Sequence, residues 1–454
     1  MKAVLSEVET IVAEATPKGR GGVGVVRVSG PKVLEVAKRI LGSVPKERTA
    51  LFSKFLDKND TVIDQGIALY FKGPNSFTGE DVLELHGHGG PVVMSHIIKT
   101  VLSLGARVAR PGEFSERAFL NNKIDLLQAE AIADLINANS EQAARSAVRS
   151  LQGEFSRHIE SLVELLIHLR MYVEGALDFP EEDIDFVKEA GIPEKLEALI
   201  QKVKIIETQA KQGALLSNGV KIVIAGKPNA GKSSLLNRLA GVETAIVTHI
   251  PGTTRDVLKE NICLDGLLLQ LIDTAGLRSS DDIVEQEGIR RAKLEMKHAD
   301  HIIFVVDSNL EKIDLNEYPE FKDLLSSGIQ ITILYNKIDL QGKQMKVEQY
   351  KDHSVVYVSV KTGEGIPEFI DHLKERVGFK STTESPFLAR QRHLDAIFLA
   401  KKHLFNAQGL LENWSLELVA EEFRQAQLAL DEITGKFTSN DLLGKIFGEF
   451  CIGK

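Results

Sequence analysis

The segment from Gly226 to Ser233 reads Gly-Lys-Pro-Asn-Ala-Gly-Lys-Ser, which has the residue types and the spacing of a loop that wraps around phosphate groups. It follows an apolar run typical of a buried strand, and a helical pattern begins directly after it. Backbone N–H groups would surround the phosphates, a lysine would neutralise their charge, and a serine hydroxyl would bind Mg²⁺. We therefore predict a phosphate site with Mg²⁺ on Ser233. Its residues are Gly226, Asn229, Ala230, Gly231, Lys232, Ser233 and Ser234.

Three later motifs, each at the end of a predicted strand, indicate a guanine nucleotide. The motif that begins at Asp273 has an aspartate that would reach Mg²⁺ through its water shell. The carboxylate of Asp339 could accept both the ring N–H and the exocyclic amine of guanine, which adenine does not offer. A backbone N–H near Ser359 could meet the guanine carbonyl. These motifs assign Asp273, Thr274, Ala275, Gly276, Asn336, Lys337, Asp339, Ser359, Val360 and Lys361 to the nucleotide. We expect a GTPase in which Lys232 and Asp273 take part in catalysis.

The loop Gly252-Thr-Thr-Arg-Asp256 lies between the first two motifs. A threonine hydroxyl there would complete the Mg²⁺ shell when the γ-phosphate is present. We assign this role to Thr254, with Thr253 as the alternative, against the simpler interpretation that the two threonines only cap a turn.

The residue after the Asp273 motif is Leu277, and an apolar side chain cannot orient an attacking water as a glutamine would. Another source of charge is needed at the transition state. Asn229 is a candidate ligand for a monovalent cation beside the β- and γ-phosphates. Glu285 is either the acid that positions the water or a solvated charge of an acidic loop.

The chain of 454 residues is long enough for about three domains. Short β-branched runs in residues 1–118 predict a mixed α/β domain, and helical spacing in residues 119–216 and again in 380–454 predicts a discontinuous helical bundle. Strands and helices alternate in residues 217–379, as in a Ras-like G domain with a doubly wound sheet. The predicted fold class is therefore multidomain α/β plus α, with the G domain inserted into the bundle.

Composition excludes several classes of protein. Hydrophobic residues at 43% and charged residues at 26% are ordinary for a folded chain, and charge interrupts every apolar run before it could span a membrane. Acidic residues stand where a signal peptide would be apolar, and two cysteines cannot form a disulfide framework, so a cytoplasmic location is expected. The net charge of -9 restricts any RNA contact to a local patch.

Several blocks along the whole chain carry a family resemblance. They include Ala15-Thr-Pro-Lys-Gly-Arg-Gly-Gly-Val-Gly24, Arg110-Pro-Gly-Glu-Phe-Ser-Glu-Arg-Ala-Phe119, Phe387-Leu-Ala-Arg-Gln-Arg-His393 and the terminal Cys451-Ile-Gly-Lys454. Together with the GTPase motifs, whose order resembles the Era-like branch of the TRAFAC class, they make the chain similar to the MnmE (TrmE) family of tRNA modification GTPases.

The resemblance implies a set of site residues beyond the motifs. Potassium would be bound by Asn229, Thr248, Ile250 and Thr253. Glu285 matches the family's catalytic acid. A one-carbon folate, 5,10-methylene- or 5-formyl-tetrahydrofolate, would contact Arg27, Glu84, Lys123 and Lys454, and Cys451 would lie near its one-carbon group as a candidate catalytic residue.

The resemblance also implies partners and a reaction. Residues 1–118 would bind folate and form a homodimer, and potassium-dependent pairing of G domains would activate GTP hydrolysis. With the FAD-dependent partner MnmG (GidA), in a heterotetramer or larger complex, the protein would add an aminomethyl or carboxymethylaminomethyl group to C5 of wobble uridine 34 of certain tRNAs. The alternative is an Era-like GTPase switch in ribosome assembly, for which an RNA-binding KH module should follow the G domain.

Overall fold

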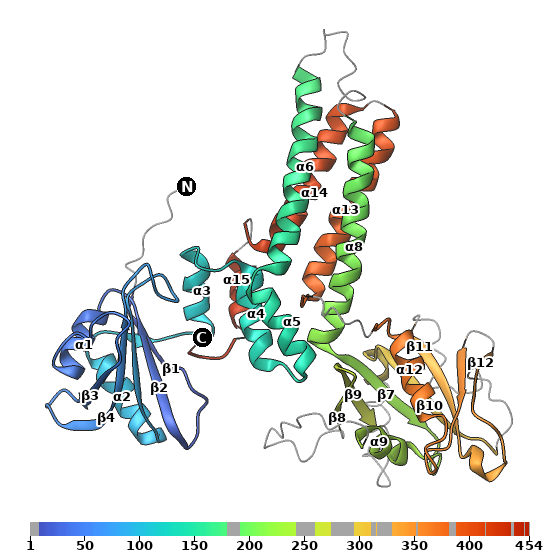
Figure 1. Ribbon diagram of the computed structural model, residues 1–454, viewed down its shortest axis with the longest axis horizontal. Helices are drawn as coiled ribbons and strands as arrows, with labels where there is room; N and C mark the ends of the chain where they lie inside the picture. The colour runs from blue at the N-terminus through green and yellow to red at the C-terminus, as the bar shows by residue number, and fades with distance from the viewer. Residues whose placement is uncertain are drawn as a thin grey trace, which may run out of the picture. The chain divides into compact units, whose positions relative to one another are not determined.

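The structure is a computed structural model (Figure 1). It describes residues 9–178, 191–241, 259–273, 295–309, 315, 329–350, 353–380, 387–413, 415–436, 440–448 and 450–453. The chain divides into two compact units, and each contains segments that are distant in sequence. The first unit comprises residues 1–133, 151–190 and 409–454, and the second comprises residues 134–150 and 191–408.

The first unit begins with a six-stranded sheet in the order β3-β4-β5-β2-β1-β6. Neighbouring strands are antiparallel except for β1 and β6, which are parallel. The strands are β1 (Ile11–Glu14), β2 (Gly21–Ser29), β3 (Leu51–Leu56), β4 (Val62–Phe71), β5 (Val82–Gly89) and β6 (Arg107–Val108). Alternation along β2 and β5 buries Val26, Val28, Leu83 and Leu85 in a core with helices α1 (Val33–Leu41) and α2 (Pro91–Ser103). The intervening side chains of these two strands therefore point to the opposite face.

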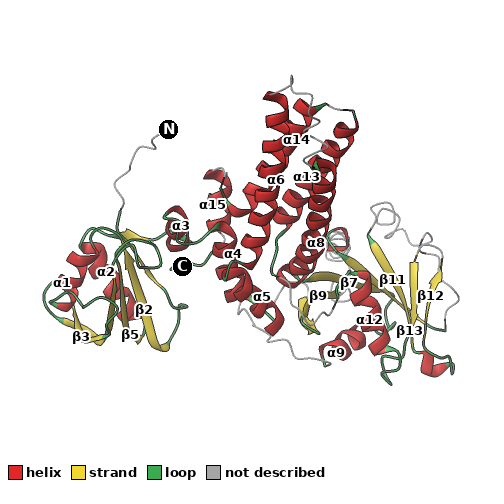
Figure 2. Ribbon diagram, turned by 45° about the horizontal axis from the view of Figure 1, so that its top comes forward, coloured by secondary structure: helices red, strands yellow, loops and turns green. Residues whose placement is uncertain are grey.

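The rest of the first unit is helical. Its helices are α3 (Glu113–Leu120), the first part of α4 (Leu126–Asn137), α6 (Glu154–Asp178), α14 (Leu416–Thr434) and α15 (Asn440–Gly448). Helices α6 and α14 run side by side (Figures 1 and 2). A smaller core joins Leu126 and Ala129 of α4 to Phe447 and Phe450 near the C-terminus. Pro111 and Ile452 form an isolated β-bridge, so the terminal segment lies beside the start of α3.

The second unit contains a seven-stranded sheet in the order β12-β13-β11-β10-β7-β9-β8. The five strands from β13 to β9 are parallel, and each edge strand is antiparallel to its neighbour. The strands are β7 (Val220–Gly226), β8 (Lys259–Leu264), β9 (Leu267–Asp273), β10 (His301–Asp307), β11 (Gln330–Asn336), β12 (Lys346–Tyr350) and β13 (His353–Tyr357). The central strands are mostly apolar because both faces of the sheet are covered.

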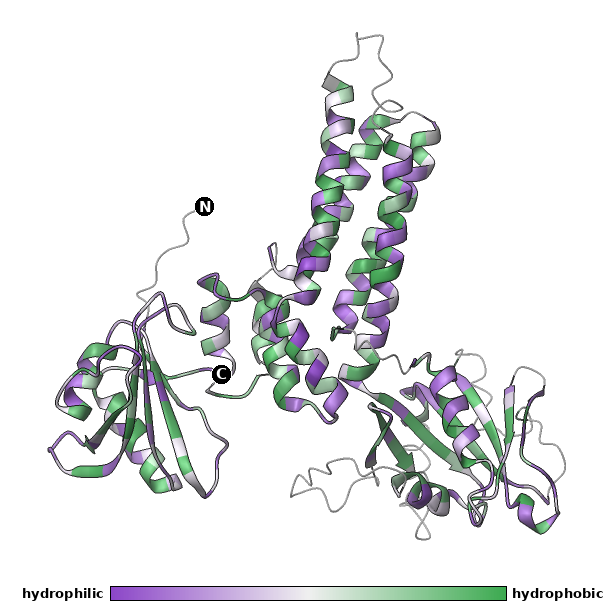
Figure 3. Cartoon of the chain, viewed as in Figure 1, coloured by the Kyte–Doolittle hydropathy of each residue, from purple (hydrophilic) through white to green (hydrophobic). Residues whose placement is uncertain are grey.

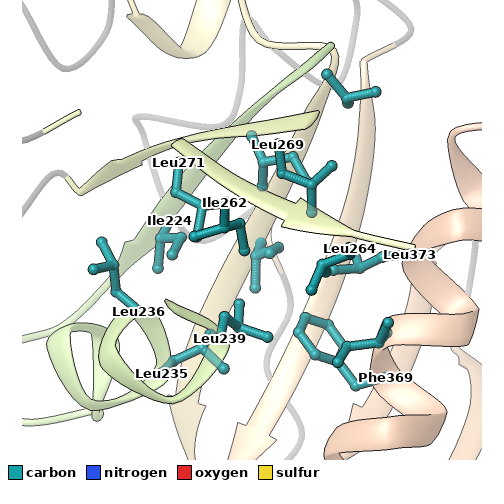
Figure 4. Close-up of a cluster of buried hydrophobic side chains, with 14 of the residues drawn as sticks. Ile224, Leu235, Leu236, Leu239, Ile262, Leu264, Leu269, Leu271, Phe369 and Leu373 are labelled. Carbon is teal, nitrogen blue, oxygen red and sulfur yellow. The ribbon is translucent and has the colours of Figure 1, made fainter. Parts of the chain in front are cut away.

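Helix α9 (Lys232–Ala240) and helix α12 (Ile366–Arg376) cover one face of this sheet. Figure 4 shows that Leu235, Leu236 and Leu239 of α9 and Phe369 and Leu373 of α12 point into the same core. The spacing of these side chains at three and four residues is that of an amphipathic helix. Burial of this face holds α9 against the sheet, and the first turn of α9, which begins at Lys232, is the one expected to meet the phosphates.

Helices α5 (Glu141–Leu151) and α8 (Ile192–Asn218) contribute Ala147 and Leu216 to the core of the seven-stranded sheet, and most of α13 (Gln391–Glu412) belongs to the same unit. Ser140 Oγ donates to the carbonyl of Gly266 at 3.0 Å, at the turn between β8 and β9. Arg390 pairs with Asp134 at 2.7 Å. The multidomain α/β plus α fold expected from the sequence is therefore confirmed, while the exact domain boundaries stay a prediction.

Hydropathy along the helices is mixed (Figure 3). Within the part of the chain that the structure describes, no helix has the length and apolar character needed to cross a bilayer.

Candidate functional site

The predicted nucleotide motifs meet at one edge of the seven-stranded sheet. β7, β10 and β11 are parallel, and their carboxyl ends at Gly226, Asp307 and Asn336 lie at the same edge. Ligands of doubly wound sheets bind at this edge, where the loops leave the strands. The topology thus brings together segments that are more than a hundred residues apart in the chain.

Glycines in the phosphate loop are required by its backbone. Gly226 has φ +145°, and a Cβ there would lie 2.2 Å from the carbonyl oxygen of Val305. Gly231 has φ +103°, and its Cβ would lie 2.2 Å from Nδ2 of Asn336. Only glycine tolerates such approaches. The loop can therefore pass directly against β10 and Asn336 before α9 begins at Lys232.

Lys232 is 7% exposed, and its Nζ donates to the carbonyls of Gly226 at 2.9 Å and Lys227 at 3.0 Å. These contacts hold the ammonium group across the loop. The N-terminal turn of a helix carries the positive end of its dipole and directs N–H groups outward along the helix axis. A phosphate bound there would meet both the lysine charge and these amides.

Asn336 ties three segments of the site together. Its side chain is 3% exposed. Its Nδ2 donates to the carbonyl of Ala230 at 2.9 Å, and its Oδ1 accepts the N–H groups of Lys337 at 2.8 Å and Val360 at 3.0 Å. The phosphate loop, the end of β11 and the loop after β13 are therefore fixed relative to one another by one amide.

The loop after β13 holds the carboxylate of Asp339, which follows β11, and offers a backbone donor. Ser359 is fully buried, and its hydroxyl donates to Oδ1 of Asp339 at 2.6 Å. The amides of Ser359, Val360, Thr362 and Gly363 all donate to acceptors within the protein. Within the described part of the chain, the N–H of Lys361 makes no such bond. Between Ser359 and Gly363, Lys361 thus has the one N–H without an acceptor among the described residues, and Lys361 and Asp339 line the same cavity.

Lys337 forms an ion pair that the sequence motifs did not predict. Its Nζ lies 2.7 Å from Oδ2 of Asp307, the last residue of β10. The hydrogen bond from Lys337 holds the pKa of Asp307 below its ordinary value, and N–H groups of Asn309 lower it further. The sequence did contain a signal for this ion pair: Asp307 is an acidic residue at the end of an apolar strand.

These segments line a cavity of about 1120 Å³, large enough for a nucleotide. It contains ten of the predicted residues, namely Asn229, Gly231, Lys232, Ser233, Ser234, Asn336, Lys337, Asp339, Val360 and Lys361. Gly226, Ala230 and Ser359 do not line it and instead hold its walls. The lining also includes Pro228, Asn237, Arg238 and Leu340, which the sequence motifs did not predict.

A second group of polar residues lies in the first unit, on the face of the six-stranded sheet that is opposite to α1 and α2. Arg27 and Glu84 are cross-strand neighbours, with Nε of Arg27 2.8 Å from Oε1 of Glu84. The Arg27 guanidinium lies 5.8 Å from the ring centre of Phe77 and 5.7 Å from that of Phe114. It also donates to the carbonyl of Gly453 at 3.3 Å.

The other residues expected at this second site are placed in part. The side chain of Lys123 packs beside Gly79, at 3.4 Å from the position that a Cβ would take there. Cys451 is a free, exposed thiol, and its carbonyl accepts the N–H of Gly112 at 3.3 Å. Arg27, Glu84 and the terminal segment are thus brought together, while their contact with folate stays a prediction.

A buried carboxylate supports the segment around α3. Glu113 is 2% exposed and accepts two hydrogen bonds from the guanidinium of Arg107, at 2.8 and 2.6 Å. It also accepts the N–H of Arg110 at 2.8 Å and a bond from Arg117 at 3.1 Å. Burial raises the pKa of Glu113, but these hydrogen bonds outweigh it and hold the pKa at about 2.

Comparisons with known proteins identify the family. A family model described as the MnmE helical domain matches residues 126–451, and one described as the N-terminus of the GTP-binding protein TrmE matches residues 10–123. The tRNA modification GTPase MnmE of Pectobacterium carotovorum is 55% identical over 99% of this chain and 100% of that protein. The chain belongs to the MnmE family. The MnmE of Coxiella burnetii is 58% identical over 98% of this chain and 99% of that protein.

Among solved structures, Era of Aquifex aeolicus is 22% identical, with 40% of this chain and 66% of that chain covered and a TM-score of 0.28. The MnmE resemblance stated from the sequence is confirmed by the full-length relatives, and with it the GTPase class.

Some residues that the MnmE resemblance and the motifs singled out lie outside the described residues. They are Thr248, Ile250, Thr253, Thr254, Thr274, Ala275, Gly276, Glu285 and Lys454. Asp273 ends β9, whose parallel neighbour β7 leads into the phosphate loop. The assignments of all these residues stay predictions.

Proposed function

We propose that this member of the MnmE family binds GTP in the cavity at the carboxyl edge of β7, β11 and β13 and hydrolyses it. One observation carries the proposal: Lys232, Ser233 and Asp339 line the same cavity, so a phosphate-binding cation, a candidate Mg²⁺ ligand and a guanine-type acceptor share one space. Phosphates would meet Lys232 and the first turn of α9.

Guanine recognition would use the donors of the base, which are the ring N–H and the exocyclic amine, and its acceptor O6. Asp339 would accept the ring N–H and the exocyclic amine, with Ser359 fixing the orientation of its carboxylate. The N–H of Lys361 would donate to O6. An adenine base would leave the Asp339 carboxylate unpaired, which costs on the order of 10⁴-fold in affinity at such sites.

Exchange of the base tests this assignment. Asp339→Asn should weaken GTP binding by roughly 10²-fold or more and favour xanthosine triphosphate, whose second carbonyl can accept a bond from the new amide. Asp371→Asn, at an exposed position of α12, is the matched control and should keep the preference for GTP. Unchanged selectivity in Asp339→Asn would exclude the proposed base site.

For hydrolysis, we propose that Mg²⁺ is held by Ser233 and Thr254, and K⁺ by Asn229 together with Thr248, Ile250 and Thr253. The donor chemistry fits, since Ser233 and Asn229 line the cavity with oxygen-bearing side chains and Asn229 has φ +63° in the phosphate loop. K⁺ would supply positive charge at the phosphates when two G domains pair, and Glu285 would position the attacking water. Equal hydrolysis rates in sodium and potassium would refute the K⁺ proposal.

In the first unit, we propose that a one-carbon tetrahydrofolate, either the 5,10-methylene or the 5-formyl form, binds at Arg27, Glu84, Lys123 and Lys454. The residues fit such a ligand because the Arg27–Glu84 pair lies beside the exposed ring of Phe77, which suits a flat heterocycle next to polar groups, while the buried ring of Phe114 supports Arg27 from within. When bound, the folate supplies the one-carbon unit. Arg27 and Glu84 would orient its ring, and Cys451 would lie near the one-carbon group.

Titration with 5-formyl-tetrahydrofolate checks the folate proposal without an activity assay. Glu84→Gln should weaken binding by about tenfold or more because a charged acceptor becomes a neutral one. Glu116→Gln, on the same unit but paired with Arg110 at 2.9 Å, is the matched control. Equal affinities in the wild type and Glu84→Gln would contradict the site.

The cellular role that we propose is modification of C5 of wobble uridine 34 in certain tRNAs, by a homodimer of this protein acting with MnmG in the cytoplasm. GTP turnover would open and close the G domains, and MnmG would supply the redox chemistry through FAD. The names of the full-length relatives support a tRNA role over the alternative of a ribosome-assembly switch. The described chain after α12 also continues as helices α13 to α15, without the KH module that this alternative needs.

Mass spectrometry of nucleosides from total tRNA tests the cellular role. Cells that lack the gene should lose the C5-substituted wobble uridines, and wild type should restore them. Lys232→Ala and Asp273→Ala should fail to restore them, whereas Lys297→Ala, at an exposed position before β10, should succeed. Unchanged tRNA with accumulating ribosome precursors would favour the alternative instead.

A further inference from the structure

Arg238 connects the two halves of the nucleotide site. It lies on α9, six residues after Lys232, and it lines the cavity although no sequence motif includes it. Its Nη2 donates to the carbonyl of Thr362 at 3.2 Å, in the loop that carries Ser359 and Lys361. The helix that begins at the phosphate site therefore reaches across to the loop that is expected to read the base.

The loop is shaped to accept this contact. Gly363 has φ +90°, and a Cβ there would lie only 2.0 Å from Nη2 and 3.1 Å from Cζ of Arg238. Backbone thus packs directly against the guanidinium, which any larger residue at this position would displace. The N–H of Gly363 donates to the carbonyl of Ser359 at 2.8 Å, so the turn is closed on itself at the point where Arg238 touches it.

The contact lies next to the amide of Lys361, which has no acceptor among the described residues. Asn336 fixes the loop at Val360, before Lys361, and Arg238 fixes it at Thr362, after Lys361. An amide between two anchored peptides has a defined direction. Thr362 and Gly363 also donate to Ser359, so loss of the Arg238 bond would loosen the direction of the Lys361 N–H without unfolding the turn or displacing Asp339 or Lys232.

We propose that Arg238 is a positioning residue for guanine, which holds the Thr362–Gly363 turn so that the Lys361 N–H faces O6 of the base. The inference rests on the proposed binding of GTP in this cavity. It assigns specificity for the carbonyl edge of the base to a residue of the phosphate-binding helix.

The test uses nucleotides that differ in one base atom. GDP has O6, 6-thio-GDP replaces it by sulfur, which is a weak acceptor, and both keep the ring N–H and the amine that face Asp339. Binding is measured for full-length wild type and Arg238→Ala by displacement of a fluorescent guanine nucleotide. Arg238→Ala should weaken the binding of GDP about three- to tenfold, which corresponds to one hydrogen bond, and should weaken the binding of 6-thio-GDP less than about twofold. The binding of IDP, which lacks the amine but keeps O6, should be weakened by the same factor as the binding of GDP.

Two variants and the remaining outcomes complete the design. Arg238→Lys keeps a donor and should recover part of the GDP affinity, and Lys297→Ala removes an equal charge from an exposed position and should bind like wild type. Equal losses for GDP and 6-thio-GDP would overturn the inference, because they would indicate an effect of charge or folding. No loss for either would overturn it as well. Failure of the wild type to bind GDP would instead refute the proposed function.

Discussion

Replacement of Asn336 by alanine should remove the hydrogen bonds that hold three segments of the nucleotide site together. The amide makes three hydrogen bonds, to the backbone of Ala230, Lys337 and Val360, and it is almost completely buried. Removal leaves one carbonyl and two N–H groups without their partner. At about 1 kcal/mol for each bond, the loss is about 3 kcal/mol, or roughly 10²-fold in affinity for GDP if all three bonds are needed for binding.

Competition with a fluorescent GDP analogue measures this loss on the full-length chain. Asn261→Ala, the same substitution at an exposed position of β8, controls for the chemistry of the change and should bind like wild type. Circular dichroism of both variants should match wild type, because the helices outside the G domain do not depend on Asn336. A loss of less than about threefold in Asn336→Ala would refute the conclusion that one amide holds the three segments together.

Three further predictions concern backbone fit, charge and the metal. Gly226→Ala should abolish detectable GDP binding, since its Cβ would lie 2.2 Å from the carbonyl of Val305; binding within tenfold of wild type would contradict the loop geometry. Glu113 has its pKa held at about 2 instead of 4.5, so it stabilises the fold above pH 4.5 and loses this effect as pH falls toward 2. Glu113→Gln should therefore lower the free energy of unfolding by about 3 kcal/mol at pH 7 and make it depend less on pH between 4.5 and 2. Acid unfolding of both proteins is followed by circular dichroism; identical pH profiles would exclude the role of the carboxylate. Removal of Mg²⁺ with EDTA should stop GTP hydrolysis, and Ser233→Ala should need more Mg²⁺ to recover it; equal Mg²⁺ requirements in Ser233→Ala and wild type would remove Ser233 from the metal site.

The repeating patterns of the sequence predicted the architecture well. An apolar run without alternation, such as β7, predicts a strand covered on both faces, and the structure buries it in that way. Edge strands were harder to predict: β12 is a five-residue strand of mostly exposed polar residues, Lys346–Tyr350, and is ordered by pairing with β13. Its structure depends on a tertiary contact, which local sequence does not encode.

Contacts across the sheet edge were also beyond the reach of the sequence. The motif around Asn336 predicts a residue near guanine, but its bonds to Ala230 and Val360 span 106 and 24 positions of the chain, respectively. The ion pair of Lys337 with Asp307 and the contact of Arg238 with Thr362 join segments that only the parallel sheet brings together. A motif specifies residue types along the chain, whereas these pairs depend on strand order.

The motif residues therefore divide into two groups: residues whose polar atoms hold the walls of the cavity in place, and residues whose polar atoms face the nucleotide space. Gly226, Ala230 and Ser359 are outside the cavity lining, and each instead accepts or donates a bond that fixes a wall. Lys361 lines the cavity and keeps its amide unused within the described chain. Substitutions of Gly226 or Ala230 should weaken the binding of all nucleotides alike, because they move the loops as a whole, whereas substitution of Ser359 acts on Asp339. Only substitutions that act on Asp339 or on the Lys361 amide should discriminate between bases, since these are the groups that a base edge can meet.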